Sequence, residues 1–199
     1  MLFRSMLGEG ARTAADAERY LELYRRVIVE VGTAVKAEGD AIGESSSISI
    51  KLSALHPRYQ AVQQQRVLNE LLPRVKELAL LAKSFDMQLT IDAEEADRLD
   101  ISLDLFESLA RDHDLAGWNG LGLVVQAYQK RGPAMVDWLI ALAEDTGRRI
   151  PTRLVKGAYW DTEIKHAQVE GFGGYPVFTR KANTDVSYIA CAQIGRAHV

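Results

Sequence analysis

Residues 153–165 read RLVKGAYWDTEIK, and this stretch indicates both the type of fold and the position of a site. The apolar pair Leu154-Val155 is typical of a buried strand, and it runs directly into Lys156 and Gly157, which two aromatic residues follow closely. A cation, a glycine that permits close backbone approach and two large aromatic side chains suit a flat, conjugated, partly anionic ligand better than a hydrophobic core. Polar residues also end three earlier strands, so the feature predicts a site.

Apolar periodicity predicts strands that alternate with helices. The expected strands are 47–52, 87–91, 120–126 and 150–155, with 5–8 as an earlier candidate. The expected helices are a long one capped by Thr13, then 59–85 (interrupted or kinked at Pro73), 95–112, 133–146, 162–169 and 179–193. The run LGLVV is apolar on both faces, which is typical of a parallel sheet covered by helices.

This alternation fits either a doubly wound open sheet or an α/β barrel of the (βα)8 type. No G-x-G-x-x-G sequence follows a strand, so the dinucleotide fingerprint of the first architecture is absent. Lys51, Asp92, Gln126 and Lys156 each end a successive strand. In a barrel these strand ends converge on one mouth, where active sites lie. The sequence therefore favours a partial (βα)8 barrel of roughly the first five βα units.

Composition narrows the classes of function. The 199 residues are 47% hydrophobic with a net charge of −3, which is typical of a globular chain and disfavours nucleic-acid binding through a basic surface. Cys191 is the only cysteine, so an internal disulfide is excluded and a cytoplasmic setting is expected. His56, His113 and His166 lack partners at metal-ligand spacing, and no metal site is expected.

Each candidate residue also has a purely structural interpretation. Lys51 could be a solvated strand-end residue, and Gln126 could be a buried amide satisfied by the backbone. The acids after Asp92 fit a helix N-terminus stabilised by the macrodipole, whereas Asp92 itself should point into the mouth. Arg153 lies in a strand suited to burial and therefore needs a polar or anionic partner. Trp118 and Trp138 are expected to be packing residues.

Five motifs resemble one known family. SISIKLSALHPRY, IDAEEADRLDISLDL, AGWNG with VVQAYQKR, RLVKGAYWDTEIK and GYPVFTRKANTDVSY are similar to the proline dehydrogenase domain of the bacterial bifunctional proline utilisation A (PutA) proteins. The likeness runs from about residue 6 to residue 193. It implies a distorted (βα)8 barrel that holds FAD at the carboxyl ends of its strands.

The resemblance also implies roles for individual residues. The residues that it places at the proline site are Lys51, Asp92, Ala158 and Tyr159, with Lys51 on the substrate carboxylate. Gln126 and Arg153 would hydrogen-bond the isoalloxazine ring, with Arg153 near N5. The remaining cofactor-binding residues would be Val155, Lys156, Gly157 and Trp160 around the flavin, and Thr179, Arg180 and Lys181 near the adenosine and phosphates.

The implied reaction is oxidation of L-proline to Δ1-pyrroline-5-carboxylate, with a membrane quinone as the electron acceptor. The implied full-length parent is cytoplasmic, with peripheral contact at the inner membrane, and carries an aldehyde dehydrogenase domain in the same chain. Homo-oligomerisation is left open. Two rival functions remain, a Schiff-base lyase that uses Lys156 or Lys51 and a non-enzymatic incomplete fragment.

The sequence departs from the family pattern in two places. Ser5 stands where the family pattern has Asp, and the family's Tyr-x-x-Arg-Arg-x-Glu motif, whose arginines would clamp the substrate carboxylate, is absent. Residues 194–199, IGRAHV, break the preceding apolar pattern and match what a sequencing-adapter oligonucleotide would encode. We therefore expect residues 1–193 to be the N-terminal part of a barrel, 194–199 to be a non-native tail, and the chain alone to be inactive.

Overall fold

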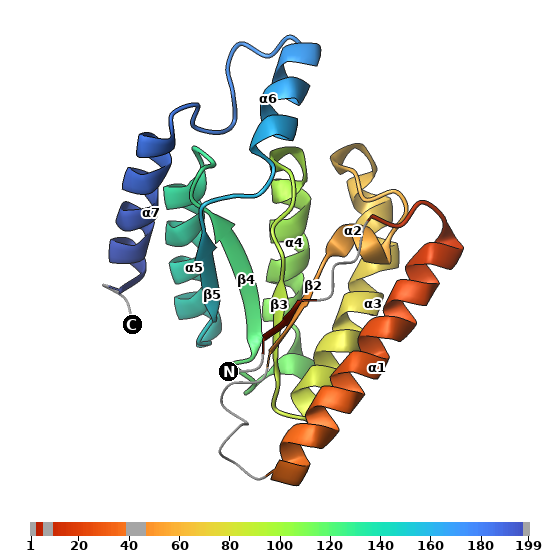
Figure 1. Ribbon diagram of the computed structural model, residues 1–199. Helices are drawn as coiled ribbons and strands as arrows, with labels where there is room; N and C mark the ends of the chain where they lie inside the picture. The colour runs from red at the N-terminus through yellow and green to blue at the C-terminus, as the bar shows by residue number, and fades with distance from the viewer. Residues whose placement is uncertain (1–2, 6–9, 39–46, 197–199) are drawn as a thin grey trace.

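The protein, seen in a computed structural model, is described over residues 3–5, 10–38 and 47–196, and it is built on one parallel sheet (Figure 1). The five strands of this sheet lie side by side in chain order. The strands are β1 (Phe3–Ser5), β2 (Ser47–Ile50), β3 (Gln88–Ile91), β4 (Leu121–Gln126) and β5 (Thr152–Val155). Every neighbouring pair is parallel, and sequential order without reversal is the topology of a barrel rather than of a doubly wound sheet.

Helices connect the strands. The α-helices are α1 (Ala14–Glu38), α2 (Leu52–Leu55), α3 (Gln64–Ser84), α4 (Leu99–Ala110), α5 (Gly132–Thr146), α6 (Trp160–Val169) and α7 (Lys181–Arg196). Three short 3-10 turns are η2 (Ala61–Gln63), η3 (Ala96–Arg98) and η4 (His113–Leu115). Helix α1 contacts α3, α3 contacts α4, α4 contacts α5, and α5 contacts α7. Figure 1 shows these helices following one another around the sheet. A partial α/β barrel is therefore confirmed.

Most boundaries agree with the sequence-based expectations within a few residues. Thr13 caps α1 as predicted, because its hydroxyl accepts from the Asp16 N–H at 3.1 Å while the Asp16 carboxylate accepts from the Thr13 N–H at 3.0 Å. Of the interruption or kink predicted at Pro73, the interruption is absent, since α3 is continuous through the proline. Leu71 and Val75 are buried on either side of the proline, and their packing holds this part of the helix in place.

The two ends of the chain are described only in part. β1 begins before the expected strand at 5–8 and pairs Ser5 with Ser49, and residues 6–9 lie outside the described part. At the other end α7 continues through Arg196, so the first three residues of the expected tail are helical and Ile194 packs partly against the core. Residues 197–199 lie outside the described part.

The core lies between the central strands and the helices. All four residues of β2 and all six of β4 are buried, whereas Thr152 of β5 is exposed and the rest of that strand is half-buried. Trp118 is buried, and Trp138 packs on Phe106 with ring centroids 6.4 Å apart, so both tryptophans are packing residues as expected. No helix within the described residues is long and apolar enough to cross a membrane.

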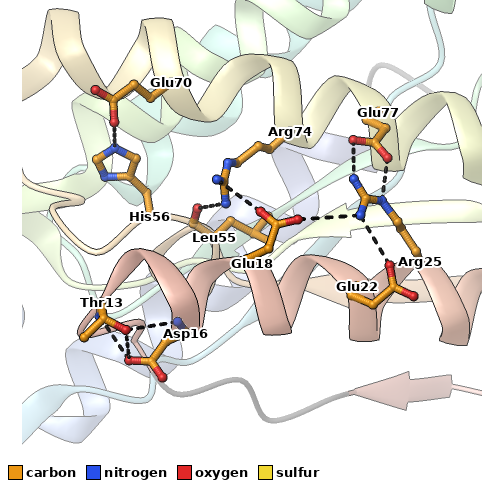
Figure 2. A network of polar contacts seen from close by, with 10 residues as sticks. All are labelled: Thr13, Asp16, Glu18, Glu22, Arg25, Leu55, His56, Glu70, Arg74 and Glu77. Atoms are coloured by element: carbon orange, nitrogen blue, oxygen red, sulfur yellow. Dashed lines mark hydrogen bonds and ion pairs between the residues drawn. The ribbon is translucent and has the colours of Figure 1, made fainter.

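The outer surface of α1 and α3 carries a network of ion pairs (Figure 2). The Arg25 guanidinium binds both carboxylate oxygens of Glu77, at 2.5 and 2.8 Å, and also Glu22 at 3.3 Å. Arg74 bridges Glu18 and the Leu55 carbonyl. These side chains are about one-third to more than one-half exposed, so the network joins two neighbouring helices at the solvent boundary.

Candidate active site

The candidate site lies where the strands end. Lys51 follows β2, Asp92 follows β3, Gln126 ends β4 and Lys156 follows β5. Because all strands are parallel and paired in register, these residues emerge at the same edge of the sheet. Figure 1 shows α6 lying beyond that edge. The predicted convergence of polar strand ends is present in the structure.

Arg153 and Asp92 form the centre of the site. The guanidinium of Arg153 pairs with the Asp92 carboxylate, and its Nη1 donates to the Ser49 hydroxyl at 2.9 Å. Arg153 lies in β5 and Ser49 in β2, so this contact spans the two intervening strands. The Asp92 side chain is only 13% exposed, and burial raises its pKa although the charges of Arg153 and Lys51 oppose that shift.

Lys51 and Tyr159 belong to the same cluster. The Lys51 backbone N–H donates to the buried Tyr24 hydroxyl at 3.1 Å, which fixes the exit of β2 against α1. The Lys51 charge acts on both the Asp92 carboxyl and the Tyr159 hydroxyl, whose pKa burial raises. Cation, carboxylate, guanidinium and phenol therefore meet at one strand edge, which is suitable for a small zwitterion.

Gln126 is the buried link between two loops. Its Nε2 donates to the Glu94 carbonyl at 2.8 Å, and its Oε1 accepts from the Ala158 N–H at 3.2 Å. The residue is 3% exposed. Both polar ends of the amide are thus satisfied by backbone, as the structural interpretation of this residue anticipated. The same bonds hold the loop after β3 beside the loop after β5.

The turn after Val155 is the most open part of the site. Gly157 has a φ of 141°, and a Cβ on it would lie 2.3 Å from the Tyr128 ring. The glycine is therefore required by both backbone conformation and packing. Lys156, Gly157 and Ala158 are exposed, and Val155 is half-buried.

A second group of expected cofactor residues gathers around the start of α7. Asp185 accepts from the ammonium groups of Lys156, at 2.6 Å, and Lys181, at 2.9 Å. The Trp160 ring N–H donates to the Phe178 carbonyl at 2.9 Å, and 42% of the residue is exposed. Thr179 and Arg180 are exposed nearby in sequence. The structure therefore places two cations and an accessible indole on the β5 side of the site.

Two buried carboxylates were missed by the sequence analysis. Glu94 was interpreted as a helix-terminal acid, but its side chain is 6% exposed, accepts from the Ser53 N–H at 2.9 Å and pairs with Arg98. Glu163 lies in the first turn of α6, is 3% exposed and accepts from the Ala96 N–H at 2.6 Å. Acids in a first helical turn are usually explained by the macrodipole, so the sequence alone gave no reason to separate these two.

Within residues 3–5, 10–38 and 47–196, no group of three or more His, Cys, Asp or Glu side chains could hold a metal ion. His56 instead contacts Glu70 through Nε2 at 3.0 Å and accepts the Arg58 N–H on Nδ1. The polar chemistry of the described site rests on lysine, arginine, carboxylate, amide and phenol groups.

The chain is similar to known proteins over nearly its whole length. It is 60% identical over 188 residues to the Bifunctional protein PutA of Salmonella typhimurium, and 61% identical over 181 residues to that of Rhizobium meliloti. A crystal structure of Bradyrhizobium japonicum Proline Utilization A superimposes with a TM-score of 0.90 at 54% identity and covers 94% of this chain.

The two curated relatives are much longer than the chain. The aligned regions cover 94% and 91% of this chain but 14% of each relative, and they cover 19% of the Bradyrhizobium chain. The profile of the family described as Proline dehydrogenase matches residues 2–197. The chain therefore belongs to the proline dehydrogenase family.

Proposed function

We propose that this chain forms the flavin-facing part of an enzyme that oxidises L-proline to Δ1-pyrroline-5-carboxylate with FAD. The observation that carries the proposal is the Arg153–Asp92 pair, held with Lys51 and Tyr159 at the strand ends of a chain in the proline dehydrogenase family. FAD, when bound, supplies the hydride acceptor.

The residues present fit a bound dinucleotide. The turn after β5 is exposed and is flanked by the exposed Trp160 and by Lys156 and Lys181, two cations that share the single carboxylate of Asp185. Lysine charges suit phosphates, and a flat indole suits a ring system. The Arg153 side chain, which is paired with Asp92, is 34% exposed at the same edge.

The remaining site residues would bind and orient the substrate. We assign the proline carboxylate to Lys51 and the walls of the substrate site to Asp92, Ala158 and Tyr159. Asp92 also holds the Arg153 guanidinium in a fixed direction, which is what an electrostatic group near a reacting centre requires. Gln126 keeps the two loops together through Glu94 and Ala158.

The relatives support a wider proposal for the parent protein. We propose that residues 1–193 are the N-terminal part of a longer barrel. We further propose an aldehyde dehydrogenase domain in the same polypeptide, a quinone as electron acceptor, and cytoplasmic location with peripheral contact at the inner membrane. Two facts support this proposal: the relatives are named as bifunctional proteins, and the aligned region covers 14% of their length.

The test uses the full product of the gene that encodes this chain. Anaerobic L-proline should bleach the flavin absorbance of the purified protein, and Lys51→Met should raise the KM for proline. Lys130→Met is the matched control, because Lys130 is also a lysine and is exposed. Its backbone N–H donates to the Pro176 carbonyl, a bond that the substitution leaves in place. Absence of bleaching would contradict the proposal, and borohydride trapping of a lysine on a carbonyl substrate would favour the Schiff-base alternative.

A further inference from the structure

Helix α6 is weakly attached to the rest of the fold. Only Glu163 and Ala167 of its ten residues are buried, and Val169 at its end is 72% exposed. Figure 1 shows the helix standing beyond the strand ends, and it makes no extensive contact with another described helix or strand. A helix normally docks through an apolar stripe. In α6 the buried side chains are instead the carboxylate of Glu163 and the methyl group of Ala167.

The contact made by Glu163 joins distant parts of the chain. Its Oε1 accepts from the backbone N–H of Ala96 at 2.6 Å, across 67 residues of sequence. Ala96 begins η3, four residues after Asp92. The same loop is bound by Gln126 through the Glu94 carbonyl and by Ser53 through the Glu94 side chain. Arg131 also donates to the Ala96 carbonyl at 3.0 Å. Glu163 is therefore one of several anchors on the loop that carries Asp92, and the one that comes from α6.

We propose that Glu163 is a positioning residue, which seats α6 on the loop 92–96 and so fixes Asp92 relative to Tyr159 and Trp160 at the start of α6. This inference rests on the proposed function for the meaning of Asp92, but the contact itself does not. Without Glu163, the Ala96 N–H would lose its acceptor in a buried setting, and α6 would keep only Ala167 as a buried contact.

The role requires an acceptor atom rather than a charge. Burial raises the pKa of the Glu163 carboxyl, and Asp97 and Glu95 add to that shift, whereas the Ala96 N–H and His166 oppose it. A protonated carboxyl or a glutamine amide still presents a carbonyl oxygen to the Ala96 N–H. Alanine presents none. Comparison of Glu163→Gln with Glu163→Ala therefore shows whether the contact requires an acceptor atom or a charge.

The direct test is amide hydrogen exchange on the full gene product. In Glu163→Ala, the peptide that covers 93–98 should exchange about tenfold faster than in the wild type, as expected for loss of one buried hydrogen bond. In Glu163→Gln the same peptide should remain protected. Asp161→Ala is the matched control, because Asp161 is an acid in the same helical turn but is exposed, and it should leave the 93–98 peptide unchanged.

Kinetics give the second measurement. Glu163→Ala should lower kcat/KM for proline about tenfold, whereas Glu163→Gln and Asp161→Ala should stay within about twofold of the wild type. Three outcomes would each overturn the inference. The 93–98 peptide of Glu163→Ala could exchange at the wild-type rate, kcat/KM could be unchanged in that variant, or Glu163→Gln could fail to restore wild-type protection and kcat/KM. A wild-type protein that does not oxidise proline would contradict the proposed function instead, and the exchange measurement would still decide whether Glu163 holds Ala96.

Discussion

Two arginine–carboxylate pairs in this protein have similar partners and different surroundings. On the outer face, Arg25 of α1 forms an ion pair with Glu77 of α3, and the pairing lowers the pKa of the Glu77 carboxyl (Figure 2). At the strand ends, Arg153 grips Asp92, and the pKa of that carboxyl is nevertheless raised because burial outweighs the attraction. At the surface, the pairing with Arg25 favours the ionised form of Glu77. At the strand ends, burial disfavours the ionised form of Asp92 despite its pairing with Arg153, and such an environment is typical of a functional site.

The largest effect that would sharpen this contrast is expected at Gly157. Substitution Gly157→Ala places a Cβ at 2.3 Å from the Tyr128 ring with φ at 141°, and it should lower the free energy of unfolding by about 3 kcal/mol. The matched control is Gly173→Ala, since nothing lies within 4 Å of a Cβ there. Urea denaturation of both variants checks the prediction, and equal stability of the two would contradict the close approach of the Tyr128 ring to Gly157.

The next effect compares the two arginines directly. Arg153→Ala leaves the Asp92 carboxyl buried without its main partner, and we expect a loss of about 2 kcal/mol in unfolding free energy. Arg25→Ala removes an exposed pair and should cost about 0.5 kcal/mol. The two midpoints in one denaturant series measure the difference. If Arg25→Ala proved the more damaging, the distinction between an outer ionic surface and a buried site would fail.

The smallest effect is a difference in pH dependence. The native state binds the Asp92 proton more tightly than the unfolded chain does, so its contribution to stability is complete below the ordinary aspartate pKa and is lost as the pH rises through the higher native pKa. Glu77 has the opposite sign, because its contribution is present above the ordinary glutamate pKa and is lost as the pH falls through the lowered native value.

Unfolding free energies of Asp92→Asn and Glu77→Gln, measured from about pH 3 to pH 7, check these signs. Relative to the wild type, Asp92→Asn should become progressively more stable as the pH rises, and Glu77→Gln progressively less. Parallel profiles for the two variants would show that the two carboxylates share one environment, contrary to the structure.

Much of the fold could be predicted from the sequence because its signals are local. The spacing of apolar residues placed every strand from β2 to β5 within two residues at each end, and the Thr13 cap placed the start of α1. The convergence of Lys51, Asp92, Gln126 and Lys156 followed from the parallel order of strands alone. Pro73 does not interrupt α3, because the packing of Leu71 and Val75 outweighs the local preference of proline.

The environment of each side chain could not be predicted in the same way. Glu94, Glu95 and Asp97 are near neighbours in one acidic run, yet only Glu94 is fully buried and serves as an anchor for the Ser53 N–H. Glu163 has no sequence feature that distinguishes it from other acids in a first helical turn, because its partner, the Ala96 N–H, lies 67 residues away. For Gln126 the sequence offered both a buried amide satisfied by the backbone and a cofactor contact, and it could not identify the Glu94 carbonyl and the Ala158 N–H as the partners of its side chain.

The sequence by itself determined the order of strands and helices, the edge at which polar residues collect and the kinship with one family, because each of these depends on residue spacing and identity. Only the tertiary structure decided which acids are buried, which pairs hold a raised pKa and how α6 is attached. Burial and electrostatic coupling depend on residues far apart in the chain, and they arise only when the strands bring those residues together.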